Sequence, residues 1–275
     1  MKRKTRIDQE LDTFNKKVKE KANSEMPDKI KFTAQDLVSV VPKTKNQILF
    51  LDSYSETYKY PNNDQNSELD IIDKNFFLLG CPGTGKTFMA FAKALEEVIL
   101  NKTKEKIIII RSVVETRPRG FLPGTEEDKE APFELPYIGI CDELLKYQWK
   151  NYERLKKAGL IEFESTSNLR GTTMHDSVII VDECQNLNFH ELDTVITRVG
   201  RNSRIIFCGD FAQTDLILNK NDKSGLPEFL KIVKHMKCFE TINFTAEDIV
   251  RSGLVKEYIL AKNKVEISDS KSNSE

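Results

Sequence analysis

Short apolar runs alternate along the chain with longer segments in which apolar residues recur every three or four positions. This alternation is typical of strands that are followed by helices. The apolar runs predict strands at residues 76–79, 106–110, 161–164, 178–181 and 204–208, and a weaker pattern predicts another at 238–242. The periodic segments predict helices at residues 45–59, 86–101, 137–158, 188–199, 224–234 and 246–262.

The strand candidates also indicate the kind of sheet. Residues 107–110 and 178–181 contain only isoleucine and valine, and strands that are apolar on both faces suit a parallel sheet with helices on both sides. Two helix starts carry the spacing of a capping box, with Asn188 before Glu191 and Thr245 before Asp248. We therefore expect one mostly parallel α/β domain over residues 30–262.

The two ends of the chain differ from this domain. Residues 1–29 are polar and predict an arm or an appended helix, whereas residues 263–275 have little to bury and are expected to be disordered. The first 31 residues hold ten Lys and Arg against six Asp and Glu. A basic arm can contact nucleic acid, but a solvated helix of mixed charge explains the same residues.

The composition of the chain limits its class. Its 275 residues include 42 Lys and Arg against 43 Asp and Glu, so the net charge does not indicate a nucleic-acid partner. The five cysteines form no C-x-x-C pair, which argues against a disulfide framework and against structural zinc. No stretch approaches the roughly 18–20 apolar residues that span a bilayer, and no signal peptide opens the chain. We expect a cytoplasmic protein without a membrane partner.

One eight-residue segment carries the strongest chemical signal. It lies between the first predicted strand and the helix 86–101, fits the pattern G-x-x-x-x-G-K-[ST], and consists of Gly80, Cys81, Pro82, Gly83, Thr84, Gly85, Lys86 and Thr87. A glycine-rich turn at a helix N-terminus aims several backbone N–H groups at one point, where the helix dipole adds positive charge. We expect Lys86 to reach the outer phosphates of a nucleoside triphosphate and the Thr87 hydroxyl to coordinate Mg²⁺.

Two further strand ends carry polar side chains. The strand 178–181 is followed by Asp182 and Glu183, which are expected to hold Mg²⁺ and to polarise the attacking water, respectively. The strand 204–208 is followed by Gly209, Asp210 and, after two more residues, Gln213. If this strand lies beside the other two, the Gln213 amide is near the γ-phosphate and can sense it or orient water. A capped surface turn is the alternative.

Several segments stand in the order found in one known family. They are residues 42–47, 80–87, 120–124, 169–172, 182–186, 197–200, 209–213, 224–226 and 248–251. Over about residues 42–262 the chain resembles the PhoH family. The resemblance implies a RecA-like P-loop NTPase core, related to the first motor domain of superfamily 1 helicases, that uses ATP and Mg²⁺.

The resemblance also implies roles for single residues. Gln47 matches a glutamine that reads the adenine edge, Arg198 matches the arginine of a Thr-Arg-x-Gly motif, and Arg251 matches an arginine finger. Together with Glu183 and Gln213, the two arginines are the candidate catalytic residues. On a chain with one core domain, the Arg251 finger acts either within its own subunit or in trans across a homo-oligomeric ring.

The chain departs from the family pattern near these motifs. Ser252 stands where histidine is frequent, Cys184 stands where alanine is common, and residues 111–120 follow the pattern only loosely. These differences affect inferences about partners and regulation more than those about ATP.

We therefore expect a Mg²⁺-dependent ATPase coupled to the handling of single-stranded RNA or DNA. The basic arm and the loop 117–120 are weak support for a nucleic-acid partner. We expect unwinding to need oligomerisation, because the sequence shows one motor domain where helicases use two. A nucleotide-dependent assembly protein remains an alternative. A small-molecule kinase is a further alternative, which Asp182, Glu183 and Gln213 disfavour.

Overall fold

The computed structural model describes residues 30–60, 70–112, 126–146, 150–166, 169, 171–210 and 224–272. The chain divides into two compact units, Met1–Lys31 and Phe32–Glu275, and the sheet with its helices lies in the second. None of the helices in these described ranges is long and apolar enough to cross a membrane.

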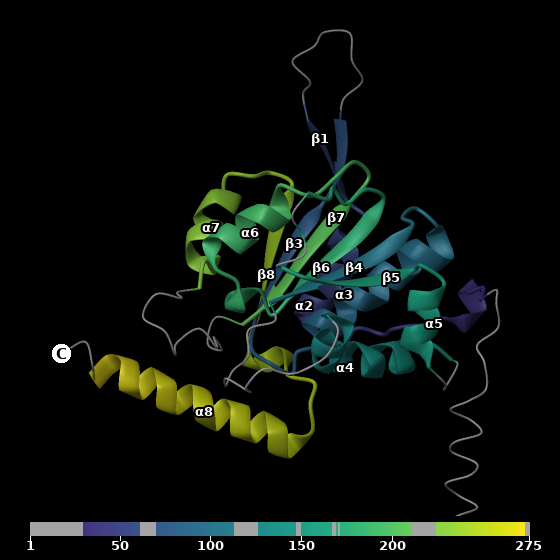
Figure 1. Cartoon of the computed structure of the whole chain (residues 1–275). Coiled ribbons are helices and arrows are strands. Elements are labelled where there is room, and N and C mark those ends of the chain that lie inside the picture. Colours follow the sequence, from purple (N-terminus) through teal and green to yellow (C-terminus); the bar gives the residue numbers. More distant parts are fainter. Residues whose placement is uncertain are drawn as a thin grey trace, which may run out of the picture. The chain divides into compact units, whose positions relative to one another are not determined.

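A six-stranded sheet forms the centre of the second unit (Figure 1). All neighbouring strands are parallel, in the order β5-β4-β6-β7-β3-β8. Each strand overlaps one predicted from the sequence; they are β3 (Asn75–Gly80), β4 (Lys106–Arg111), β5 (Ile161–Ser165), β6 (Ser177–Asp182), β7 (Arg204–Gly209) and β8 (Phe239–Phe244). Because the strands are parallel, their carboxyl ends share one edge, where ligands bind in open α/β sheets.

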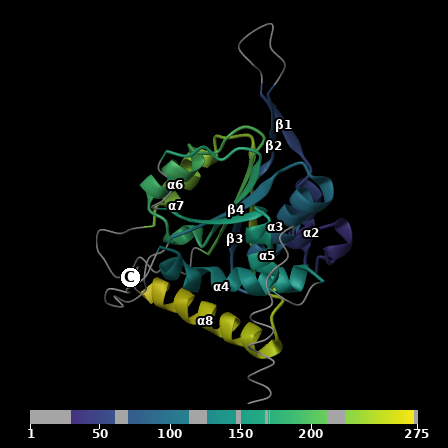
Figure 2. The same ribbon diagram turned by 45° about the vertical axis from the view of Figure 1, so that its right-hand side comes forward.

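Helices cover both faces of this sheet (Figure 1 and Figure 2). One face packs against α2 (Lys45–Ser53), α3 (Lys86–Leu95), α4 (Glu126–Leu144) and α5 (Asn151–Lys157). The other face packs against α6 (Phe189–Ile196) and α7 (Leu226–Val233). Alternate residues of β3 supply the two cores: Phe76 and Leu78 face the first, and Phe77 and Leu79 face the second. The predicted mostly parallel α/β fold with helices on both faces is thus confirmed.

Several helices differ from the sequence-based prediction. The helix expected at 86–101 continues from α3 as a π-helical turn, η2 (Glu96–Asn101). The helix expected at 137–158 is the two helices α4 and α5. The helix expected at 246–262 begins as a 3₁₀ turn, η5 (Ala246–Asp248), and resumes as α8 (Gly253–Ser272). Helix α8 therefore runs into the tail that was expected to be disordered.

A two-stranded ribbon replaces part of another predicted helix. Helix α2 ends at Ser53 instead of residue 59, and Thr57–Tyr60 forms β1, which pairs antiparallel with β2 (Asp70–Asp73). Threonine and tyrosine favour extended backbone. Pairing with β2, which begins ten residues after Tyr60, stabilises the strand over the helix. The prediction of helix at residues 57–59 is therefore wrong.

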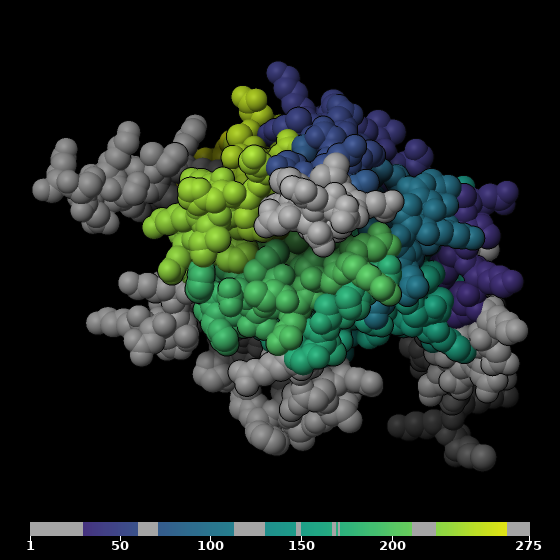
Figure 3. Space-filling view, turned by 90° about the horizontal axis from the view of Figure 1, so that it is seen from above, coloured from purple at the N-terminus to yellow at the C-terminus, as the bar shows by residue number. Residues whose placement is uncertain are grey.

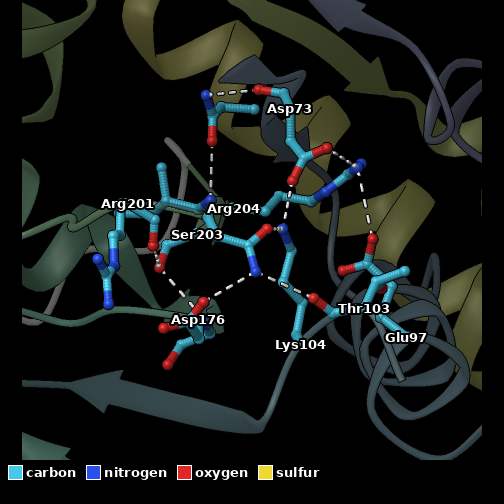
Figure 4. A network of polar contacts seen from close by, with 12 residues as sticks. Asp73, Glu97, Thr103, Lys104, Asp176, Arg201, Ser203 and Arg204 are labelled. Carbon is cyan, nitrogen blue, oxygen red and sulfur yellow. Dashed lines mark hydrogen bonds and ion pairs between the residues drawn. The ribbon is translucent and has the colours of Figure 1, made fainter. Parts of the chain in front are cut away.

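Buried ion pairs anchor the ribbon where it meets the amino-terminal edge of the sheet (Figure 4). Asp73 contacts the Arg204 guanidinium at 3.3 Å and the Lys104 ammonium at 2.5 Å. Arg204 also pairs with Glu97 at 3.5 Å and lies 3.9 Å from the centre of the Tyr54 ring. Figure 3 looks down on this edge, where blue, teal and green segments of the chain meet. Asp73 thus links the base of the ribbon to Lys104 and to Arg204 at the start of β7.

Candidate functional site

The glycine-rich loop connects β3 directly to α3. Gly80, Gly83 and Gly85 have φ of 126°, 75° and 83°, a left-handed region that residues with a Cβ atom adopt only at a cost. The Lys86 ammonium donates to the carbonyl oxygens of Gly80 and Cys81, both at 2.7 Å. Lys86 therefore lies over the loop, beside the backbone that would receive phosphate.

Residues from the far end of the domain close this loop. A Cβ on Gly80 would lie 1.8 Å from the Phe244 carbonyl oxygen, so only glycine fits there. The Cys81 N–H donates to that same oxygen at 3.2 Å, and the Val250 N–H donates to the Gly83 carbonyl at 3.0 Å. The conformation of the loop is thus fixed by backbone hydrogen bonds to β8 and to the turn after it.

Gln47 braces the loop from helix α2. Its side chain is 4% exposed; Nε2 donates to the Thr84 carbonyl at 2.9 Å, and Oε1 accepts from the Lys43 N–H at 2.7 Å. A glutamine amide has two N–H donors and two acceptor sites on its oxygen. The two contacts use one of each, so one donor on Nε2 and one acceptor site on Oε1 are left over. The role of Gln47 in reading adenine stays a prediction.

Two oxygen-bearing side chains that could bind a metal ion, Thr87 and Asp182, lie in contact beside the loop. The Thr87 hydroxyl at the start of α3 donates to Asp182 Oδ1 at 2.7 Å, and the Tyr137 hydroxyl on α4 donates to Asp182 Oδ2 at 2.9 Å. Mg²⁺ prefers hard oxygen ligands and is usually bound by one or two carboxylates with substrate phosphates. The hydroxyl of Thr87 and the carboxylate of Asp182 fit that ion.

Glu183 lies next to this pair in an unusual backbone conformation. Its φ is 51°, and its Oε2 accepts from Gln185 Nε2 at 2.6 Å. Gln185 Oε1 in turn accepts from the Asp210 N–H at 3.0 Å, which joins the ends of β6 and β7. Burial, followed by the charge of Asp182, raises the pKa of Glu183.

The order of the strands explains how the predicted residues meet. Strand β7 lies between β3 and β6, as predicted, so the turn after it starts beside both the loop and Glu183. Gln213 lies outside the described residues, as do residues 117–120, and their predicted roles stay predictions.

Arg251 lies against the loop of its own chain. A Cβ built on Gly83 would be 2.8 Å from Arg251 Cγ, and 3.7 Å from Ile259 of α8. The Arg251 side chain itself is exposed. The structure therefore brings this arginine, whose role the family resemblance implied, to the edge of the candidate site.

The position of Arg198 requires a correction. Helix α6 follows the carboxyl end of β6 and returns to the amino-terminal edge of the sheet, where the Arg198 carbonyl accepts from the Met174 N–H at 2.8 Å. Met174 precedes β6 (Ser177–Asp182), whose length at about 3.3 Å per residue separates the two edges. Arg198 therefore does not belong to the site around Asp182 in its own chain.

Three residues of the site were missed by the sequence reasoning: Arg111, Tyr137 and Gln185. Arg111 ends β4 and lies in register with Asp182. Burial lowers the pKa of its guanidinium, but Tyr137, Asp182 and Glu183 together raise it above the usual value. The only sequence signal for Arg111 was its place directly after an apolar strand. Tyr137 gave no signal, because its helix comes from a distant part of the chain.

The fold and the site together define a class of protein. A parallel sheet with a glycine-rich loop before α3, a threonine after its lysine, and an aspartate ending β6 constitutes a P-loop NTPase core. The chain belongs to the PhoH family, a family of P-loop NTPases: a family model described as "PhoH-like protein" matches residues 58–263.

Curated relatives agree with this assignment. A "PhoH-like protein" of Mycobacterium tuberculosis (strain ATCC 25618 / H37Rv) is 31% identical over 246 residues, which cover 87% of this chain and 68% of the relative. A "PhoH-like protein" of Bacillus subtilis (strain 168) is 35% identical over 189 residues, or 68% of this chain and 58% of the relative. "Protein PhoH" of Escherichia coli (strain K12) is 33% identical over 179 residues, which cover 65% of this chain and 50% of the relative.

Proposed function

We propose that this chain binds ATP together with Mg²⁺ and hydrolyses it. The observation that carries the proposal is the 2.7 Å contact between the Thr87 hydroxyl and Asp182, directly beside the glycine-rich loop. Backbone N–H groups of the loop and the N-terminus of α3 suit the phosphates. Glu183 lies next to Asp182 in the sequence, where it can orient water.

The chain's own residues divide the work of phosphoryl transfer. Lys86 exchanges the carbonyl oxygens of Gly80 and Cys81 for phosphate oxygens, while Glu183, held by Gln185, orients the water and accepts its proton. Mg²⁺ held by Thr87 and Asp182 would neutralise phosphate charge. The stem of the exposed Arg251 side chain lies beside Gly83 of the loop, from where its guanidinium can reach the transferring group and stabilise its charge.

The test is phosphate release by the purified protein with ATP and Mg²⁺. We expect Lys86→Ala to lower the rate about 100-fold or more, because a donor to the transition-state charge is lost. Lys93→Ala is the matched control, because Lys93 lies on the same helix α3 but pairs with Glu96 at 2.5 Å, and its rate should stay within about twofold. Equal rates for the wild type and Lys86→Ala would disprove hydrolysis at this site.

We further propose that hydrolysis is coupled to single-stranded RNA or DNA. The family's relation to helicase motor domains and the basic residues 1–31 support this partner. Phosphate release should rise when single-stranded nucleic acid is added at low salt, and the stimulation should fade as salt increases, because backbone contacts release counterions. Lack of stimulation at low salt would contradict the coupling.

Nucleotide-dependent assembly is a second candidate function. The observation that favours it is the apolar surface of α8 and the turn before it, where Leu254 is 79% exposed and Tyr258 is 68% exposed. This surface adjoins the loop, since Ile259 of the same helix faces Gly83. A light-scattering mass measured with and without ATP and Mg²⁺ separates assembly from turnover.

A further inference from the structure

Tyr137 is a buried phenol that contacts the predicted metal site from a separate helix. Its side chain is 0% exposed, and its hydroxyl donates to Asp182 Oδ2 at 2.9 Å. The other oxygen, Oδ1, accepts from the Thr87 hydroxyl at 2.7 Å. Donors from α3 and α4 therefore hold the two oxygens of one carboxylate, which fixes its rotation.

The ring and the hydroxyl of Tyr137 have different surroundings. The ring stacks on Phe91 of α3 at a centroid distance of 5.5 Å and packs against Phe163 of β5 at 6.1 Å. A phenylalanine would satisfy these contacts equally well. A hydroxyl, in contrast, is costly to bury unless it forms a hydrogen bond. The contact with Asp182 therefore accounts for a tyrosine at this position.

Helix α4 also contacts the strand next to Asp182 through a second residue, Phe133. Arg111 ends β4 in register with Asp182, and its guanidinium lies 6.0 Å from the centre of the Phe133 ring on α4. Helix α4 thus contacts the carboxylate directly through Tyr137 and packs through Phe133 on the residue beside Asp182 in the sheet.

We propose that Tyr137 is a positioning residue for the metal ion: its hydroxyl orients the Asp182 carboxylate for Mg²⁺, so the affinity of the site for Mg²⁺ depends on helix α4. The inference rests on the proposed Mg²⁺-nucleotide function and adds a residue to it. Partners that orient a metal-binding carboxylate typically contribute about 10–100-fold to metal affinity.

Tyr137→Phe tests the inference, because it keeps the ring contacts and removes only the hydroxyl. The measurement is the binding of a fluorescent ATP analogue during titration with Mg²⁺, which requires no turnover. We expect the Mg²⁺ concentration at half-saturation to rise about tenfold or more. Binding of the analogue in EDTA should stay close to that of the wild type, because Asp182 holds no metal ion under that condition.

Tyr152→Phe is the matched control. Tyr152 is 2% exposed and lies on α5, so the same atom is removed from another buried tyrosine outside the site. Its half-saturation should equal that of the wild type. A purely structural role of Tyr137 would instead weaken metal-free binding as much as binding with Mg²⁺.

The outcomes separate the inference from the function on which it rests. An unchanged half-saturation in Tyr137→Phe, with normal binding by the wild type, would overturn the role of Tyr137 alone. A wild type that binds no analogue at any Mg²⁺ concentration would overturn the proposed nucleotide site and this inference together.

Discussion

Glu183 combines a strained backbone with a tightly held side chain. A residue other than glycine in a left-handed conformation costs about 1–3 kcal/mol, and Glu183 has a φ of 51°. Gln185 Nε2 donates to the Glu183 carboxylate at 2.6 Å, and Gln185 Oε1 accepts from the Asp210 N–H at 3.0 Å. The strained turn therefore aims the carboxylate, and Gln185 keeps it in place.

Gln185→Leu should lower kcat for ATP hydrolysis more than it changes KM. A hydrogen bond to a charged group contributes about 1.5–3 kcal/mol, which corresponds to a loss of about 10–150-fold in kcat. Asn188→Ala is the control, because Asn188 caps α6 by accepting from the Glu191 N–H at 3.0 Å. That variant should lose about 1 kcal/mol of unfolding free energy and keep its kcat. Equal kcat values in Gln185→Leu and the wild type would contradict the positioning of Glu183.

The residues of the site were predictable from sequence only where their signal is local. Lys86 and Thr87 stand in a fixed spacing, and Asp182 and Glu183 directly follow an apolar strand. Tyr137 comes from a helix 45 residues before its partner Asp182, and no pattern within its own segment indicates that contact. Arg198 was misplaced for a related reason: its position at the edge opposite the loop depends on the path of α6.

At the scale of elements, Asp248 joins η5 to α2. Its Oδ2 accepts from the Thr245 N–H at 2.9 Å and from Asn46 Nδ2 at 2.7 Å. Burial raises the pKa of Asp248, but hydrogen bonds from Thr245, Thr44 and Asn46 outweigh it and lower the pKa below the usual 3.8. The charged form of Asp248 therefore stabilises the fold.

The contribution of Asp248 should depend on pH in a definite direction. Because its pKa is lower in the folded chain, the stabilisation is fully present above the usual 3.8 and is lost as the pH falls through the folded value. Asp248→Asn should lower the unfolding free energy by about 1–3 kcal/mol at pH 7, and the difference from the wild type should shrink below about pH 4.

Urea unfolding at pH 7, 5 and 3.5 measures this difference. The exposed Asp193 of α6 provides a control, since Asp193→Asn should differ little from the wild type at each pH. A difference for Asp248→Asn that grows as the pH falls would contradict the lowered pKa.

The sequence predicted the strands of the central sheet, most of which are buried. It did not predict the two-stranded ribbon, whose extended conformation depends on pairing with a later segment. All six strands of the central sheet were predicted, four of them from continuous apolar runs, and the capping boxes predicted at Asn188 and Thr245 are both present. The ribbon at Thr57–Tyr60 was missed because its partner Asp70–Asp73 has no continuous apolar run. Ion pairs such as that of Asp73 with Arg204 anchor it, and such pairs leave no periodic pattern.

At the scale of the whole molecule, the position of Arg251 bears on whether the site is shared between subunits. The Arg251 side chain packs on Gly83 of the same chain, which supports action within one subunit. The sequence alone left action in trans across a ring equally open.

Mixing two inactive variants distinguishes these arrangements. Arg251→Ala and Glu183→Gln should each lower kcat, on the order of 10³-fold for a lost arginine finger. If Arg251 serves its own chain, a mixture of the two should show only the average of their separate rates in a phosphate-release assay. Partial recovery in the mixture would establish a site completed by a neighbouring subunit.

The contacts that close the phosphate loop have a consequence for the growing chain. The loop carbonyl of Gly83 and the N–H of Cys81 find their partners in Val250 and Phe244, more than 160 residues later. During synthesis the loop emerges long before those partners. A nascent chain that ends before β8 therefore lacks the backbone that shapes the loop, and the proposed nucleotide site can form only after Val250 has been synthesised.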